Sequence, residues 1–147
     1  MHSLADAERA FRALLIYVRA EVRDGVPLAQ IPWVRAAIAD LWAEIHAATL
    51  LLWQLTWLQE TGQDTTKQAA ALKIVAAEVQ ERTLSLAIDI VGPEGVLESW
   101  GADTPGVPMQ GLLPELYRST RNWFIAGGAN EIKRNIIAQR GLGLPRG

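Results

Sequence analysis

The feature that most limits the possible folds is a long series of apolar residues between residues 31 and 55. Its members lie alternately three and four residues apart: Ile31, Val34, Ile38, Leu41, Ile45, Ala48, Leu52 and Leu55. This spacing places their side chains on one face of an α-helix. Pro32 suits the first turn of such a helix, and Gly62 marks its end. At ~1.5 Å per residue the helix is roughly 45 Å long, so the sequence predicts an elongated bundle.

Two further long helices are expected, one on each side of this helix in the sequence. The first covers residues 4–23, because the glycine and the proline that follow it are helix stop signals. The third ends near Val91, before a Gly-Pro pair, and Thr65 with Gln68 at its start matches a capping box. One face of the third helix is expected to be apolar: Leu72, Val75, Val79, Leu86 and Ile90.

The C-terminal part of the chain contains shorter elements. Residues 94–111 are rich in glycine and proline and are expected to form a loop with one short helical turn. Residues 114–124 and 130–140 are each expected to form a helix. The sequence has no strand-like alternation, no internal repeat and no low-complexity tract. It therefore predicts a single all-α domain over residues 1–147, an up-and-down helical bundle with a C-terminal hairpin.

The composition argues against several classes of function. The chain has 14 basic and 16 acidic residues, whereas a nucleic-acid-binding domain is expected to present a basic face. It has no cysteine, which rules out disulfides, thiolate metal sites and cysteine nucleophiles. Asp40, Glu44 and His46 lack the Glu-x-x-His spacing of a di-metal bundle. We therefore expect no nucleic-acid partner and no metal.

The second helix is also the most apolar part of the chain. Its central stretch, residues 41–58, contains charged and polar side chains and is short for a bilayer, so we expect a buried or interface helix and no membrane span. Trp42, Trp53 and Trp57 lie partly off the apolar face, which predicts self-association or docking against another domain. An unusually apolar core helix is the alternative. The N-terminus lacks the apolar core of a signal peptide, so a cytoplasmic location is expected.

A pair of glycines near the C-terminus is the strongest candidate for a functional site. Gly127 and Gly128 follow an apolar run and precede the last expected helix. Glycine lets the backbone approach a ligand closely, and the first turn of a helix has free N–H groups. Such a turn is suited to binding an anion or a carbonyl oxygen. An ordinary turn between two helices has the same pattern.

Four segments of the sequence resemble motifs of one protein family. They are residues 117–121 (Tyr-Arg-Ser-Thr-Arg), 127–134 (Gly-Gly-Ala-Asn-Glu-Ile-Lys-Arg), 90–95 (Ile-Val-Gly-Pro-Glu-Gly) and 23–28 (Arg-Asp-Gly-Val-Pro-Leu). The family's corresponding features are Tyr-Arg-Asp-x-Arg, Gly-Gly-Thr-x-Glu-Ile-Gln-Arg, the turn after its long third helix and the turn of its first hairpin. The sequence thus resembles the acyl-CoA dehydrogenases, flavoenzymes that introduce a carbon–carbon double bond into acyl-CoA thioesters. The resemblance runs from about residue 10 to residue 145.

The resemblance implies an FAD cofactor and an acyl-CoA substrate. In the family, the backbone N–H at the position of Gly127 helps to polarise the thioester carbonyl. Four positions are implied to lie against the flavin: Gly128, Ala129, Asn130 and Glu131. Four more are implied to contact the flavin of a neighbouring subunit: Arg23, Asp89, Gly92 and Pro93.

The sequence departs from the family pattern at several positions. Many members carry the proton-abstracting glutamate at the position of Gly127, which has no side chain, so this tail supplies no catalytic base. Other usual residues are also replaced: an arginine by Glu21, a phenylalanine by Asp24, and glutamines by Pro32 and Asp89. Acidic groups weaken the binding of a pyrophosphate, and Arg23 is the nearby cation that offers compensation.

Family members are much longer chains, with a helical domain and a β-domain before the bundle. We therefore expect this chain to be the C-terminal domain of an FAD-dependent acyl-CoA dehydrogenase, without those N-terminal domains and inactive by itself. It is expected to contribute to the FAD site and to an oligomer interface, in a homo-oligomer or with a partner subunit that supplies the missing domains. The alternative is a non-catalytic helical module for oligomerisation or partner binding.

Overall fold

The computed structural model describes residues 2–99 and 106–146 of the chain. Its main elements are α1 (His2–Ala20), β1 (Val22–Arg23), β2 (Val26–Pro27), α2 (Pro32–Glu60), α3 (Thr66–Val91), α4 (Leu112–Ile125) and α5 (Asn130–Ile136). Shorter turns are η1 (Leu28–Gln30), η2 (Pro93–Val96), η3 (Pro108–Gly111) and a π-helical turn, η4 (Ile137–Gly141). The described residues confirm the predicted all-α bundle.

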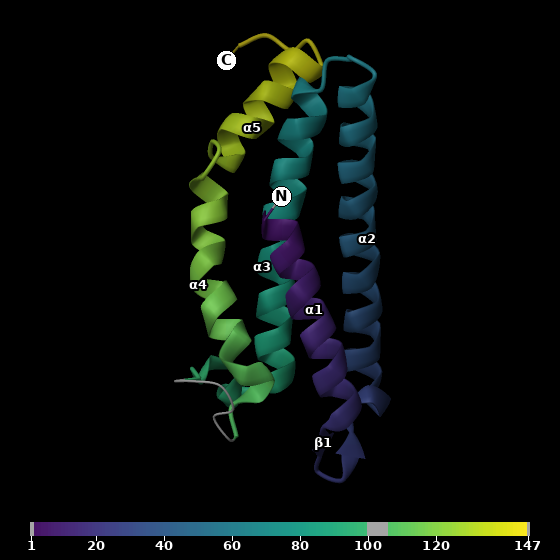
Figure 1. The fold of residues 1–147 in the computed structure, drawn as a ribbon, viewed down its shortest axis with the longest axis vertical. Helices are drawn as coiled ribbons and strands as arrows, with labels where there is room; N and C mark the ends of the chain where they lie inside the picture. Colours follow the sequence, from purple (N-terminus) through teal and green to yellow (C-terminus); the bar gives the residue numbers. More distant parts are fainter. Residues whose placement is uncertain (1, 100–105, 147) are drawn as a thin grey trace.

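The third helix is the centre of the bundle. α1, α2 and α3 run alternately down and up, and α4 and α5 lie on the other side of α3 (Figure 1). α3 packs against each of the other four α-helices of the described chain. Its buried residues therefore surround much of the helix and are not limited to the single apolar face that the sequence predicts. Leu72, Val79 and Ile90 of that predicted face are buried, and so are Ala77 and Leu84.

The apolar core has two parts along the bundle. The larger lies toward the end that holds the hairpin and includes Ala10, Leu14, Val18, Leu28, Val34, Leu84, Ala87, Ile90, Val91, Leu112, Leu113 and Leu116. The smaller is formed by Leu4, Ala7, Leu41, Ile45, Ala48, Ala76 and Val79. Because α3 contributes to both, it is the rigid element that connects the two ends of the molecule.

The first helix is shorter than predicted. It ends at Ala20, and Val22 pairs with Pro27 in an antiparallel hairpin of two-residue strands. Asp24 (φ 51°) and Gly25 (φ 77°) form its turn in the left-handed conformation. Asp-Gly is a strong signal for such a hairpin turn. The expectation of no strand was wrong here, whereas the resemblance placed residues 23–28 at the turn of a hairpin, where the structure has one.

The predicted capping box of α3 is also wrong. Thr65 precedes the helix but makes no capping hydrogen bond through its side chain. Asp64 takes this role, because its Oδ1 accepts hydrogen bonds from the Thr66 backbone N–H (3.0 Å) and hydroxyl (2.6 Å). Asp, Ser and Thr all suit helix starts, so neighbouring candidates compete for one position.

The C-terminal helices do not form the predicted hairpin. α5 continues in nearly the same direction as α4 and covers the other half of α3 (Figure 1). α4 has 14 residues and α3 has 26, so at ~1.5 Å per residue α4 alone covers about half of α3. The last helix becomes π-helical after Ile136. Part of the predicted loop at residues 94–111 lies outside the described residues, and its described flanks form η2 and η3.

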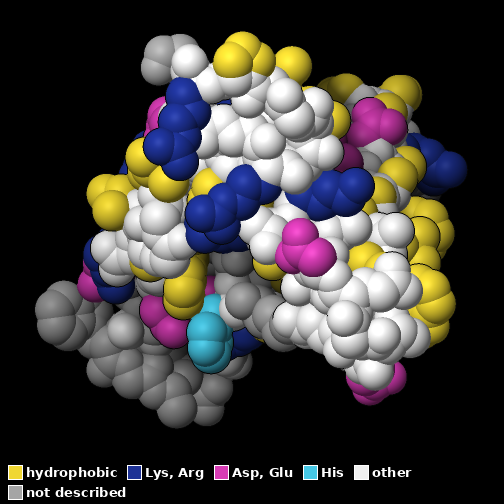
Figure 2. Space-filling model, turned by 90° about the horizontal axis from the view of Figure 1, so that it is seen from above, with side chains coloured by type: hydrophobic (Ala, Val, Ile, Leu, Met, Phe, Trp, Pro, Cys, Tyr) yellow, Lys and Arg dark blue, Asp and Glu magenta, His cyan; other side chains and the backbone are white. Residues whose placement is uncertain are grey.

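The outer face of α2 is not covered by another element of the described chain. Trp42, Trp53 and Trp57 are 51%, 65% and 57% exposed, which supports the interface interpretation over a core helix. By length and composition alone α2 is also apolar enough to cross a membrane, a test that core helices of soluble proteins also pass. Seen from above, hydrophobic side chains gather along the edge on the side of α2 (Figure 2).

Candidate functional site

The glycine turn joins α4 to α5. Gly127 (φ 70°) and Gly128 (φ 98°) are both in the left-handed region, where other residues are strained. The Gly128 N–H donates to the Ile125 carbonyl (3.1 Å). The Gly127 N–H has no hydrogen bond within the described part of the chain. A Cβ at Gly127 would meet no atom within 4 Å, so the turn has open space beside this residue.

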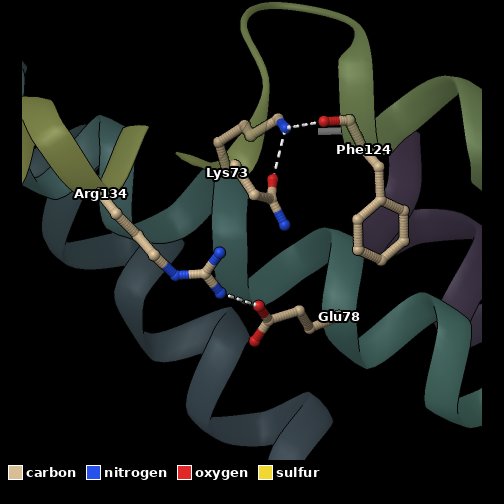
Figure 3. Close-up of polar contacts among 5 residues, drawn as sticks. Lys73, Glu78, Phe124 and Arg134 are labelled. Atoms are coloured by element: carbon tan, nitrogen blue, oxygen red, sulfur yellow. Dashed lines mark hydrogen bonds and ion pairs between the residues drawn. The ribbon is translucent and has the colours of Figure 1, made fainter. Parts of the chain in front are cut away.

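Two side chains of α3, Lys73 and Glu78, hold the turn in place through contacts with α4 and α5 (Figure 3). The Lys73 Nζ donates to the Phe124 carbonyl (3.1 Å) and to Asn130 Oδ1 (2.5 Å), which connects the end of α4 to the start of α5. The Arg134 Nη2 donates to Glu78 Oε1 at 2.5 Å. Burial lowers the pKa of Lys73, and the charge of Lys133 lowers it further. The geometry of the turn is therefore fixed by contacts far apart in sequence.

An apolar cavity of about 290 Å³ adjoins the turn. Its walls come from α1, α2, α3 and the end of α4, and include Leu4, Leu52, Leu72, Lys73, Trp123 and Gly127. The Trp123 Nε1 is buried and has no hydrogen-bond partner among the described residues. His2 stacks on the Trp123 ring with centroids 5.6 Å apart. The cavity is suited to an apolar group that carries an acceptor oxygen, because N–H donors lie in its wall.

The predicted positions around the turn differ in what they present. Gly127 and Glu131 are exposed, whereas Gly128 and Ala129 are half-buried. Asn130 is only 3% exposed, and its side-chain oxygen is occupied by Lys73. The Asn130 side chain therefore serves to hold the turn, through the bond from Lys73 to its Oδ1.

The remaining predicted residues lie at the far end of α3. The Arg23 Nη2 donates to the carbonyls of Ile90 (2.9 Å) and Val91 (2.8 Å), which neutralises the C-terminus of the helix. Gly92 (φ 92°) is close to this guanidinium, since a Cβ there would be 3.9 Å from Nη2, and Pro93 starts η2. A polar groove of about 460 Å³ runs beside them.

Two acidic residues, Glu21 and Asp89, lie near this end of α3 but face different surfaces. Glu21 lies in the polar groove, where burial raises the pKa of Tyr17 and Glu21 raises it further. Asp89 does not face the groove: it is exposed and lines a different hollow, toward α2, with Asp40 and Glu44. The structure thus brings Arg23, Gly92 and Pro93 together and separates Asp89 from them.

The two groups of predicted residues are at opposite ends of one rigid helix. Lys73, beside the glycine turn, and Val91, beside Arg23, are 18 residues apart on α3, about 27 Å. The turn between α4 and α5 is in the upper half of Figure 1, and the hairpin is at the bottom. One ligand that contacts both kinds of group would therefore use the turn of one chain and the Arg23 end of another.

Sequence reasoning missed the residues that shape the site. Lys73 is a lone cation between Leu72 and Ile74, and this placement on a largely apolar helix is the signal that could have identified it. Glu78, also on α3, holds Arg134 of α5 in an ion pair. In the part of the chain that the structure describes, no three His, Asp or Glu side chains gather in a way that could hold a metal ion.

Comparisons with known proteins find relatives of this chain in sequence and in structure. The family model described as "Acyl-CoA dehydrogenase, C-terminal domain" matches residues 1–142. The probable acyl-CoA dehydrogenase YngJ of Bacillus subtilis is 27% identical over 134 residues, 91% of this chain and 32% of that protein. The chain therefore spans about a third of the length of this curated relative.

Solved structures share the fold over nearly the whole chain. The Tcur3481-Tcur3483 steroid ACAD is 28% identical, with a TM-score of 0.84 over 96% of this chain and 35% of that one. The FAD complex of PigA is 25% identical, with a TM-score of 0.77 over 97% of this chain and 34% of that one. The described bundle thus corresponds to one part of larger proteins.

Proposed function

Because this chain belongs to the acyl-CoA dehydrogenase family, as its C-terminal domain, we propose that it forms part of an FAD and acyl-CoA site. The reaction is the α,β-dehydrogenation of an acyl-CoA thioester. The observation that carries the proposal is the free N–H of Gly127, a residue that lines an apolar cavity and has open space beside its Cα. We place the protein in the cytoplasm, in lipid metabolism.

Each part of the turn has a chemical task in this proposal. The Gly127 N–H donates a hydrogen bond to the thioester carbonyl, which favours loss of the α-proton because negative charge develops on that oxygen. The cavity accepts apolar atoms of the acyl group. Lys73 and Arg134 hold the donor in position.

In this proposal, the FAD cofactor contacts the backbone of the turn. Gly128 and Ala129 have small or no side chains and are half-buried in the turn, and Glu131 lies in the first turn of α5. FAD, when bound, accepts the hydride from the acyl β-carbon. The chain supplies no base at Gly127, so the base and the remaining walls come from a partner subunit or from domains outside these 147 residues. The isolated chain is therefore expected to be inactive.

FAD titration followed by flavin fluorescence tests the cofactor half of the proposal. We expect saturable binding by the wild-type chain and at least a tenfold loss in Gly128→Val, whose side chain blocks the approach to the turn and meets Lys133. Gly62→Val is the matched control, since Gly62 (φ 71°) is equally left-handed but lies in the turn between α2 and α3. Equal affinities of the two variants would contradict the site.

A second candidate function is a non-catalytic module for oligomerisation or partner binding. The missing side chain at Gly127 and the exposed tryptophans of α2 favour it. An assay with acyl-CoA and an artificial electron acceptor separates the two functions, with the wild-type chain tested alone and together with candidate partner subunits. Turnover that requires this chain would reject the module, whereas assembly without turnover or flavin binding would support it.

A further inference from the structure

Lys73 differs from the other lysines of the chain in what surrounds its amino group. The chain has three lysines, Lys67, Lys73 and Lys133. Of these, Lys73 alone belongs to the described walls of the apolar cavity beside the glycine turn. Its Nζ makes no ion pair within the described part of the chain. Both of its hydrogen-bond acceptors, the Phe124 carbonyl and Asn130 Oδ1, are uncharged (Figure 3), so no paired anion holds the proton on this amine.

The two hydrogen bonds of Nζ leave one position on the nitrogen unused. An ammonium group has three N–H donors, and the described residues accept from two of them. The neutral amine therefore keeps both bonds and has its lone pair in the third position. Burial lowers the pKa of Lys73 and the charge of Lys133 lowers it further, whereas Glu131 raises it. A lysine beside apolar groups and another cation is the kind that acts as a nucleophile.

The same cavity is the place where the proposed function puts an acyl thioester. Gly127 lines the cavity together with Lys73, and its N–H has no partner within the described chain. This N–H donates to the thioester carbonyl in the proposed function, so the inference rests on that function for its acyl donor. A donor at the carbonyl oxygen also stabilises the tetrahedral anion that forms when an amine attacks the carbonyl carbon. A thioester held here is thus activated toward Lys73 as well as toward loss of its α-proton.

We propose that Lys73 is a self-acylation site, which takes the acyl group from thioesters held at the glycine turn. The neutral Nζ attacks the carbonyl carbon of the thioester, a C–N bond forms and the C–S bond breaks. The thiol leaves with the proton that Nζ loses, and Lys73 becomes a neutral amide. The reaction needs no oxidant, reductant or metal, because the energy-rich thioester bond is exchanged for an amide.

Acylation changes the clamp on the turn as well as the charge of Lys73. An amide nitrogen carries one hydrogen, whereas the clamp has two acceptors, the Phe124 carbonyl and the buried Asn130 oxygen. One of these acceptors therefore loses its donor when Lys73 is acylated. The acyl group also occupies space in the cavity. Modification thus loosens the glycine turn and fills the site beside it.

Mapping of the acylated lysines by mass spectrometry tests the reaction. The purified chain is treated near neutral pH with the butyryl thioester of N-acetylcysteamine, a small donor that needs no CoA-binding residues, and in parallel with butyryl-CoA. Lys73 is expected to be butyrylated on the order of tenfold faster than Lys67, because the cavity positions the thioester beside its amine. Lys67 is the reference within the same molecule, since it is exposed at the start of the same helix. Equal rates at the two lysines with both donors would overturn the proposal.

Lys73→Arg separates the modification from the clamp. Arginine keeps the charge and the N–H donors, but it stays protonated and does not take up the acyl group. Butyrylation of Lys73 is expected to lower the Tm of the wild-type chain by about 3–6 °C, because one buried acceptor loses its donor. The treated Lys73→Arg variant is expected to keep the Tm that it has before treatment. A fully butyrylated Lys73 with no fall in Tm would contradict the loosening of the turn. The comparison of Lys67 with Lys73 needs no variant, so it holds even where Lys73→Arg does not fold.

The flavin titration shows whether a negative result concerns Lys73 or the proposed function. The small thioester measures the reactivity of Lys73 without any FAD. Saturable FAD binding without selective acylation overturns the role of Lys73 and leaves the proposed function in place. Selective acylation of Lys73 without FAD binding supports the nucleophile and counts against the flavin site.

Discussion

Lys73 is the residue on which the shape of the candidate site depends most. Its ammonium group connects the Phe124 carbonyl at the end of α4 with the buried Asn130 amide at the start of α5. Both acceptors are uncharged, and burial together with Lys133 lowers the pKa of Lys73. The lysine therefore acts as a hydrogen-bonding clamp on the glycine turn rather than as one half of an ion pair.

Lys73→Met is predicted to destabilise the protein by about 1–3 kcal/mol, because the buried oxygen of Asn130 loses its donor. Lys67→Met is the control, since Lys67 is exposed on the first turn of the same helix. Urea unfolding followed by circular dichroism measures both free energies. Equal changes in the two variants would show that the clamp contributes nothing to stability.

The residue scale is also where sequence reasoning is weakest. The glycine turn was predicted correctly as a break between two helices, because glycine has a strong local preference there. The acceptors of Lys73 are 51 and 57 residues away in sequence, so no local pattern indicates them. The same holds for Arg23, which lies 67 and 68 residues from the carbonyls that it caps.

At the scale of elements, the long helices follow from the sequence and their ends do not. Apolar spacing over many turns is a strong signal, and it predicted α2 and α3 to within about two residues. The end of a helix depends on a single capping or turn residue, and neighbouring residues compete for that role. Asp64 rather than Thr65 caps α3, and Asp24-Gly25 forms a hairpin rather than only a helix stop.

The cap of α3 is predicted to be pH-dependent. Hydrogen bonds from Thr66 lower the pKa of Asp64 below its ordinary value of 3.8. The stabilisation is therefore present above that value and is lost as the pH falls through the folded-state pKa. Asp64→Ala should have a lower Tm than wild type near neutral pH, and the difference should shrink as the pH falls through the folded-state pKa of Asp64.

Thermal melts of Asp64→Ala and Thr65→Ala at several pH values check this prediction. Thr65 makes no side-chain cap, so its substitution should change Tm little at any pH. A Tm difference between Asp64→Ala and wild type that persists in acid would show that the aspartate acts through something other than its charge.

At the scale of the whole molecule, α3 keeps the two groups of predicted site residues apart. It packs against all four other α-helices of the described chain and separates the glycine turn from Arg23 by about 27 Å. A helix packed on all sides is too rigid to bring these ends together. The sequence indicated both groups of residues, but their separation depends on how the helices pack, which motif spacing does not reveal.

The separation predicts complementation between two defective chains. If FAD uses the turn of one copy and the Arg23 end of another, Gly128→Val and Arg23→Ala should each abolish binding alone. In a random mixture, half of the dimers contain both variants, and each of these has one intact site of two. About a quarter of the wild-type flavin sites should therefore reappear.

Flavin fluorescence of the mixture after equilibration measures this fraction, and mixing Gly128→Val with Gly128→Ile gives the baseline. A mixture no better than this baseline would mean that each site lies within one chain or that the Arg23 end does not contact FAD.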